Sequence, residues 1–302
     1  MSNRSCIQPW MWLACLWVAV SLIAGGLFAA DAPTSAPVQP LRILMTADNE
    51  GQTRPCSHCP VGVGLGGMAR RATAIDRARQ DHPLLLLDAG NALFGGDSTD
   101  GRIIIAAFNA LHYDALNVSY RDFRHGKQAT LQALKEAKFP VLSANLMDEK
   151  TEKPLFLPYV IRTLGGQNVA LIGLCEPPAG LDLLPHLQAQ LAGIRIDDPI
   201  ESLAHWLSEI KPQAGQVIVL YYGTPAGTQA VCRAYGRQIA AIGAGGFGPD
   251  DLPADDKAVL FAADPHGKSL ADVRLGNESS IGQLRIDPSL PEDPQMQKLL
   301  AH

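Results

Sequence analysis

The chain alternates between short apolar runs and longer stretches in which apolar residues recur with helical spacing. Leu41–Ala47 and Pro83–Asp88 predict buried strands, whereas Gly66–Gln80 combines helical spacing with the helix formers Ala and Arg. Apolar strands separated by helices indicate an α/β fold with a sheet that is covered on both faces. Further strands are expected at 114–118, 140–144, 169–174, 216–222 and 239–243, and helices at 100–111, 126–137, 199–210 and 228–237.

The last part of the chain has a different pattern. Three short apolar segments, 258–263, 269–275 and 281–286, follow one another without a helical stretch between them. With turn residues at their ends, they predict strands that complete the same domain. The expected organisation is a single domain over residues 41–287, followed by a C-terminal tail over residues 288–302.

Residues 1–40 have the pattern of a targeting segment and a linker. Arg4 precedes a charge-free apolar stretch from Ile7 to Ala30, which is typical of a secretory signal peptide over residues 1–30. The same stretch is long enough to span a bilayer, so an uncleaved N-terminal anchor is the alternative. Residues 31–40 form a Pro/Ala/Ser linker. Both alternatives place the domain in the periplasm or outside the cell, and only the anchor involves the membrane.

Composition is consistent with a globular core and argues against nucleic-acid binding. Apolar residues make up 47% of the chain and charged residues 18%, which is ordinary for a folded domain. The formal net charge is -5, whereas a non-specific nucleic-acid binder needs a basic surface.

Four of the six cysteines lie beyond the apolar N-terminal stretch: Cys56, Cys59, Cys175 and Cys232. Export permits disulfides, and the sequence does not choose among the three full pairings of four cysteines. Cys56 and Cys59 form a C-x-x-C motif, which suits a structural disulfide, a redox pair or half of a metal site. His58 and Cys175 are candidate partners for the metal alternative.

Polar and aromatic residues follow the expected strands. In sheets of this kind, ligands bind beyond the carboxyl ends of the strands, so residues at those ends should share one surface. We therefore expect the functional site among residues that end successive strands, namely Asp48, Asn91, Tyr120, Cys175, Tyr222 and Gly245.

An ordered series of segments carries a family resemblance. LRILMTADNEG, GLGGMARRATAIDRARQDHPLLLLDAGNALFGG, FNALHYDALNVSYRDFRHG, FPVLSANL, NVALIGL, QVIVLYYG and AVLFAADPHGKSLADVRL occur in this order. The series resembles the catalytic-type domain of the 5′-nucleotidase family among the calcineurin-like metallophosphoesterases. The resemblance implies a single-domain four-layer α-β-β-α sandwich, and the separate C-terminal substrate domain of many such nucleotidases is not expected here.

The resemblance also implies a site with two divalent metal ions, in which a bridging carboxylate and several histidines hold the metals and a histidine assists the leaving group. This chain departs from that pattern at most positions. Asp48 is kept, but Glu50 stands at a histidine position and Asn91 at the bridging aspartate. Tyr120 stands at an asparagine ligand, and Arg121 at the histidine that assists the leaving group.

Three further histidine ligands of the family pattern are also replaced, by Tyr222, Gly245 and Phe247. The ligands of a second metal are therefore missing, and aromatic side chains at positions 120, 222 and 247 are expected to fill its space. Asp48, Glu50 and Asn91 still offer oxygen atoms to one hard cation.

Three functions stay open on these residues. The leading interpretation is a non-catalytic domain that binds a small anionic or nucleotide-like ligand, with one divalent cation or none. In this interpretation Arg121 binds an anion where the family's histidine stood. The second is a metal-dependent phosphoester hydrolase with a rebuilt site that includes Arg121 and Asp122 beside Asp48, Glu50 and Asn91. The third is a thiol-redox or metal-binding protein that uses Cys56 and Cys59.

Overall fold

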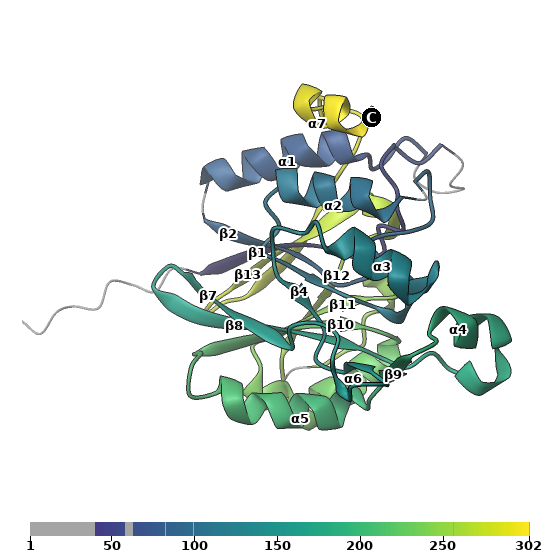
Figure 1. Cartoon of the computed structure of the whole chain (residues 1–302). Helices are drawn as coiled ribbons and strands as arrows, with labels where there is room; N and C mark the ends of the chain where they lie inside the picture. The colour runs from purple at the N-terminus through teal and green to yellow at the C-terminus, as the bar shows by residue number, and fades with distance from the viewer. Residues whose placement is uncertain (1–39, 58–62, 82, 99, 256, 302) are drawn as a thin grey trace, which may run out of the picture. The chain divides into compact units, whose positions relative to one another are not determined.

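Two large sheets lie face to face, with helices on the outer side of each (Figure 1). The computed structural model describes residues 40–57, 63–81, 83–98, 100–255 and 257–301. The arrangement of helix, sheet, sheet and helix confirms the four-layer sandwich implied by the family resemblance.

The first sheet has six strands in the order β14-β13-β1-β2-β3-β4. Strands β1 to β4 run parallel, whereas β13 and β14 add to the β1 edge in antiparallel fashion. All the parallel strands therefore end at the same edge of the sheet. The bounds are β1 Leu41–Thr46, β2 Leu84–Asp88, β3 Ala115–Asn117, β4 Val141–Leu142, β13 Ser269–Leu275 and β14 Ser280–Arg285.

The second sheet has five strands in the order β12-β11-β10-β8-β7. Strands β8, β10, β11 and β12 are parallel, and β7 pairs with β8 in the antiparallel sense at the edge. The bounds are β7 Tyr159–Leu164, β8 Gln167–Cys175, β10 Gln216–Tyr222, β11 Ala241–Gly245 and β12 Val259–Ala262. A separate small sheet joins β6 Lys153–Pro154, β5 Leu146–Asp148 and β9 Ile194–Ile196.

Most of the helices lie in two outer layers, and one helix projects from the sandwich (Figure 1). Helices α1 Met68–Asp81, α2 Gly101–Ala110, α3 Gly126–Leu134 and α7 Pro294–Leu300 lie on the side of the first sheet, and α5 Pro199–Ile210 and α6 Pro225–Tyr235 on the side of the second. Helix α4, Pro185–Gln190, projects from the sandwich. Short 3-10 turns are η1 Tyr120–Phe123, η2 Leu181–Leu183, η3 Gly236–Gln238, η4 Pro249–Asp251 and η5 Pro265–Gly267.

Side chains along β1 point alternately to the two faces of the first sheet, so this sheet contributes to two cores. Ile43 and Met45 face the second sheet and join a core with Leu171 and Leu220. Leu44 points the other way, into the core beneath α1 and α2. Because successive side chains of a strand point to opposite faces, an all-apolar strand buries both faces. The expected coverage of both faces is therefore found for each large sheet, which has helices on one face and the other large sheet on the other.

Residues 288–302, expected as a tail, contain helix α7, which packs against the first helical layer. Met296 is only 4% exposed and joins the core with α1 and α2. The Asp293 backbone N–H donates to the Ala69 carbonyl at 3.0 Å, and Arg70 pairs with Glu292 at 3.3 Å. The segment is thus an integral part of the domain.

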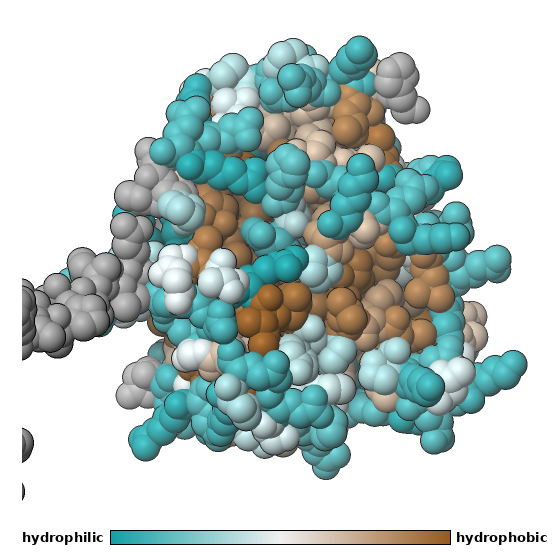
Figure 2. Space-filling view, turned by 60° about the vertical axis from the view of Figure 1, so that its left-hand side comes forward, coloured by the Kyte–Doolittle hydropathy of each residue, from teal (hydrophilic) through white to brown (hydrophobic). Residues whose placement is uncertain are grey.

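The surface mixes polar side chains with apolar patches (Figure 2). The large apolar side chains that remain exposed among the described residues include Leu157, Leu183 and Ile281. None of the described helices is long and apolar enough to cross a bilayer. The apolar stretch Ile7 to Ala30 lies outside the described residues.

Candidate functional site

The loops after β1 and β2 interlock at the carboxyl ends of the strands. The Asp48 N–H donates to the Gly90 carbonyl and the Glu50 N–H to the Asn91 carbonyl, both at 2.9 Å. Asp48, Glu50 and Asn91 all have positive φ, at 49°, 49° and 58°. Such backbone is costly for residues other than Gly and persists only where surrounding contacts hold it. These strand-end side chains are therefore held in place by their loops.

The side chain of Asn91 lies between two carboxylates. Its Nδ2 donates to Asp48 Oδ1 at 2.8 Å and to Glu50 Oε1 at 3.1 Å. One amide thus supplies both of its N–H groups to the two acids that stand at metal-ligand positions of the family pattern. The sequence placed these three residues at one surface, and the structure brings them into direct contact.

Two further donors complete the surroundings of Asp48. The Tyr222 hydroxyl donates to Oδ1 at 3.0 Å, and the Gly246 N–H donates to Oδ2 at 2.7 Å. Asp48 is only 7% exposed. Burial raises its pKa, while the bonds from Asn91, Gly246 and Tyr222 act in the opposite direction. Both carboxylate oxygens are therefore satisfied by the protein itself.

Glu50 has a different partner, which sequence reasoning missed. His266 Nε2 lies 3.6 Å from Glu50 Oε2, and its influence is the main reason that the pKa of Glu50 is lowered. The His266 backbone N–H also donates to the Asp48 carbonyl at 2.7 Å. His266 has a φ of 60° in the turn that precedes β13. It lies in the turn between β12 and β13, four residues after the end of β12, and the weak signal in the sequence is the surrounding Asp-Pro-His-Gly turn.

The buried carboxylate of Asp122 accepts hydrogen bonds from the backbone of the loop after β2 and of the turn before η1. Its Oδ1 accepts from the N–H groups of Ala92 and Leu93, and its Oδ2 from those of Asn91 and Ser119 and from the Ser119 hydroxyl. The residue is 1% exposed, and burial raises its pKa. With all these bonds made, its carboxylate is directed at backbone amides, which favours a structural role over the expected place in a rebuilt catalytic site.

Aromatic side chains meet beside this network. The rings of Tyr120 and Tyr222 are 5.9 Å apart in an edge-on arrangement, and the Tyr120 N–H donates to Cys175 Sγ at 3.2 Å. A methyl group at Gly245 would lie only 3.1 Å from the Tyr222 ring, so the lack of a side chain there makes room for that ring. Phe247 is half-buried, and the described contacts join it to no other site residue.

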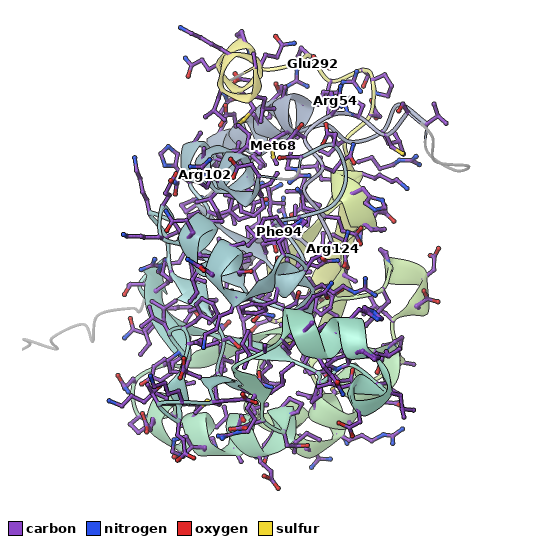
Figure 3. All side chains as sticks on the ribbon, turned by 45° about the vertical axis from the view of Figure 1, so that its right-hand side comes forward. Arg54, Met68, Phe94, Arg102, Arg124 and Glu292 are labelled. Atoms are coloured by element: carbon purple, nitrogen blue, oxygen red, sulfur yellow. The ribbon has the colours of Figure 1, made fainter. Side chains whose placement is uncertain are left out.

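Two arginines lie at the open side of the network. The Arg121 guanidinium is 5.8 Å from the centre of the Tyr120 ring. Arg124 approaches the Gly95 backbone, and Figure 3 shows it near Phe94. Sequence reasoning identified Arg121 but not Arg124, because Arg124 is the residue that ends a 3-10 turn and has no place in a strand-end pattern.

The residues present do not fit a two-metal centre. Asn91 directs N–H groups at Asp48 and Glu50, and Tyr222 and Gly246 add two more donors at Asp48. Donors repel a cation in the place where it would need oxygen ligands. One oxygen, Asn91 Oδ1, is buried without a partner among the described residues. Within those residues, no group of three or more His, Cys, Asp or Glu side chains is placed to hold a metal.

The loop after β1 carries the first cysteine of the C-x-x-C motif. Cys56 is disulfide-bonded, whereas the thiols of Cys175 and Cys232 are free and buried. His58 and Cys59 lie outside the described residues. A disulfide-bonded Cys56 has no thiolate to offer a metal, and a buried Cys175 has its pKa raised by burial, so neither fits the expected metal alternative.

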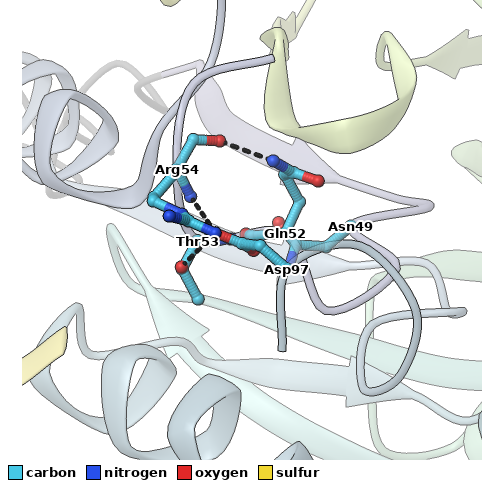
Figure 4. A network of polar contacts seen from close by, with 5 residues as sticks. All are labelled: Asn49, Gln52, Thr53, Arg54 and Asp97. Carbon is cyan, nitrogen blue, oxygen red and sulfur yellow. Dashed lines mark hydrogen bonds and ion pairs between the residues drawn. The ribbon is translucent and has the colours of Figure 1, made fainter. Parts of the chain in front are cut away.

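Asp97 fixes the start of that loop (Figure 4). Its carboxylate accepts from the N–H and hydroxyl of Thr53, at 2.6 and 2.8 Å, and from the N–H and Nε of Arg54, at 3.0 and 2.8 Å. Burial opposes ionisation of Asp97, but these bonds outweigh it and its pKa is lowered. A charged Asp97 therefore ties the loop beside the site to the segment after β2.

Comparison with known proteins finds relatives in sequence, although no family model matches the chain. A 2′,3′-cyclic-nucleotide 2′-phosphodiesterase/3′-nucleotidase of Yersinia enterocolitica is 28% identical over 225 residues, which cover 67% of this chain and 34% of that protein. A 5′-nucleotidase of Homo sapiens is 33% identical over 182 residues, covering 56% of this chain and 29% of that protein. The chain thus matches about a third of the length of these curated relatives.

Solved structures share the fold. A 5′-nucleotidase precursor from Thermus thermophilus superposes with a TM-score of 0.71 at 23% identity, covering 87% of this chain and 58% of that chain. A calcineurin-like phosphoesterase from Bacillus subtilis gives a TM-score of 0.70 at 20% identity, covering 88% of this chain and 96% of that chain. At these identities the likeness concerns the fold alone.

Proposed function

Since the chain contains a 5′-nucleotidase-like domain with the calcineurin-like metallophosphoesterase fold, we propose that it is an exported, non-catalytic member of this group that binds a small anionic ligand without a metal centre. Export rests on the apolar N-terminal stretch of the sequence. Non-catalytic binding rests on the surroundings of the two acids.

The observation that carries the proposal is the donation of both Asn91 N–H groups to Asp48 and Glu50. In a working site of the family pattern, an aspartate at this position bridges two cations with its oxygens. Here the side chain is an amide that directs N–H groups at the two acids. Tyr222 and Gly246 supply the remaining bonds that Asp48 requires. A charged carboxylate that accepts several hydrogen bonds is stable without a cation.

Arg121 supports the binding of an anion. It stands where the family pattern has the histidine that assists the leaving group, and a guanidinium stays charged at all working pH values. It can attract an oxyanion but is a poor proton donor for a leaving group. The position thus favours binding over acid catalysis.

Metal content and turnover measured on one sample of the purified protein test the proposal. Elemental mass spectrometry should find less than stoichiometric Mn, Fe, Zn or Ca. Hydrolysis of bis(p-nitrophenyl) phosphate and of nucleoside monophosphates should stay at the background rate, with or without added divalent metal. Near-stoichiometric metal together with turnover that Asp48→Ala abolishes would establish the hydrolase alternative instead.

A further inference from the structure

A cavity of about 360 Å³ lies between the 3-10 turn η1 and the projecting helix α4. This volume is within the range of small-molecule sites. Turn η1 and the residue after it supply one side, and α4 the other. The lining residues are Tyr120, Arg121 and Arg124 from the first side and His186, Leu187 and Gln190 from the second.

The geometry of η1 aims two arginines at this cavity. A 3-10 helix has three residues per turn, so side chains at positions i and i+3 leave from the same side. Arg121 and Arg124 have this spacing, and the Arg124 N–H donates to the Arg121 carbonyl at 3.2 Å. Both side chains line the cavity, which makes them a pair rather than two separate surface charges.

Neither guanidinium has a carboxylate within ion-pair distance among the described residues. Other arginines of the domain do: Arg54 pairs with Asp97, and Arg195 with Asp197. Glu50 acts on both Arg121 and Arg124 electrostatically, but its own oxygens face Asn91 and His266. The pair thus keeps its attraction for an incoming anion.

The described residues that line the cavity include no acidic side chain. Besides the two guanidiniums, the imidazole of His186 and the amide of Gln190 can donate hydrogen bonds. The Tyr120 ring and Leu187 provide apolar surface between these polar groups. A site of this kind suits an anion with several oxygens attached to a small organic group.

We propose that the cavity binds a phosphate monoester or a similar tetrahedral dianion, clamped by Arg121 and Arg124, with its organic group against Tyr120 and Leu187. Guanidinium groups pair with phosphate oxygens through two parallel hydrogen bonds, and two such groups match the charge of a dianion. The proposal deepens the proposed function, because it places the anionic ligand beside the metal-free network and names its chemistry.

Calorimetric titration of the purified full chain in EDTA tests this assignment, with phenyl phosphate, inorganic phosphate and benzoate as probes. Phenyl phosphate should bind most tightly, because it combines the dianion with an aromatic group, and benzoate most weakly. Arg121→Gln and Arg124→Gln should each weaken phenyl phosphate binding about tenfold or more, since each removes a charge-assisted contact. Arg237→Gln, at an exposed arginine of η3 that lies far along the chain from both walls, is the matched control and should bind as the parent does.

Circular dichroism and thermal melting verify that each variant is folded. A parent protein that binds no probe in EDTA, or binding that survives both substitutions, overturns the assignment. Either result leaves the non-catalytic part of the proposed function, which metal content and turnover test, unaffected. Conversely, metal-dependent turnover together with arginine-dependent binding in EDTA would overturn the non-catalytic proposal and keep the anion site.

Discussion

The amide of Asn91 shows how one residue can change the character of a whole site. An aspartate there would add a third negative charge beside Asp48 and Glu50, and a cation would be needed to offset it. The amide instead donates to both acids, at 2.8 and 3.1 Å. Donation to a charged group is worth more than an ordinary hydrogen bond, so the neutral side chain stabilises the cluster by itself.

Asn91→Asp should therefore destabilise the protein near pH 7 and create a need for a cation. Loss of two hydrogen bonds and the added repulsion should lower the free energy of unfolding by about 2 kcal/mol. The loss should shrink as the pH falls towards 4, because Asp48, whose pKa is raised by burial, takes up a proton. Millimolar Ca²⁺ or Mn²⁺ should raise the melting temperature of the variant but not that of the parent, as thermal unfolding in each buffer would show.

Asn277→Asp is the control for this experiment. It adds the same charge in the exposed turn between β13 and β14. Its melting temperature should change little and should not depend on the cation. An equal rise for the parent protein in Ca²⁺ or Mn²⁺ would mean that Asp48, Glu50 and Asn91 already form a cation site.

At the scale of elements, the strand-end loops rather than the strands decide what the site can do. The β1 loop places Asp48 and Glu50, and Asp97 from the segment after β2 holds its continuation through Thr53 and Arg54 (Figure 4). Downstream, Pro55 and Gly66 form an isolated bridge that brings the ends of the cysteine loop together. Asp97 thus restrains the part of the loop that precedes this bridge.

Asp97→Asn should loosen this loop without unfolding the domain. An amide cannot accept all the bonds that the carboxylate accepts from Thr53 and Arg54, and it has no charge to pair with Arg54. We expect faster hydrogen exchange at the Thr53 and Arg54 amides and a loss of about 1 kcal/mol in stability. Asp250→Asn, in an exposed 3-10 turn, should change neither. Unchanged exchange at Thr53 and Arg54 in the Asp97 variant would show that other contacts hold the loop.

Regular elements were the most predictable part of the fold. Gln216–Tyr222, Ser269–Leu275 and Pro199–Ile210 have the bounds expected from their apolar spacing. The edge strand Tyr159–Leu164 was missed, because its side chains are mostly half-buried and give no clear alternation. The strands of the small sheet have two or three residues each, too few to show any period.

The site was predictable only where it follows strand ends. Asp48 and Asn91 end parallel neighbours in one sheet, so their proximity follows from topology. His266 and Arg124 come from turns, whose positions depend on tertiary contacts that no periodic pattern reports. The sequence showed that Asn91 replaces a bridging aspartate, but Asn91 was expected to offer its oxygen to a cation. That its N–H groups donate to both acids became visible only in the structure.

At the scale of the whole molecule, buried acids set how stability depends on pH. Burial raises the pKa of Asp48, Asp88, Asp114 and Asp122. Each such group binds a proton more tightly in the folded state than in the unfolded chain, so its contribution to stability is lost as pH rises. The network around Asp88 extends this effect into the core: the Thr46 hydroxyl donates to Asp88 Oδ2 at 2.7 Å and also contacts the Tyr113 hydroxyl at 2.9 Å.

Asp88 should dominate this behaviour near neutral pH. It is fully buried at the end of β2, and its pKa is raised to about 8, chiefly by burial, with Asp122 adding to the rise and Thr46, Gly90 and Arg71 opposing it. Below the pKa of the unfolded chain, about 4, both states are protonated and the contribution is complete. Between about pH 4 and pH 8 the folded state holds one more proton, so stability should fall by up to about 1.4 kcal/mol per pH unit.

Asp88→Asn tests this assignment because the amide imitates the protonated acid at every pH. Urea unfolding between pH 5 and pH 9 should show the parent losing stability relative to the variant up to about pH 8, after which the difference should stay constant. Asp76→Asn, on the exposed side of α1, removes an acid that is not buried. The stability of this control should depend on pH as that of the parent does. If the difference in stability between the Asp88 variant and the parent does not change with pH, Asp88 is ionised over the whole range in the folded protein. Arg71, fully buried and with two of its nitrogens unpartnered among the described residues, would then be its counter-charge.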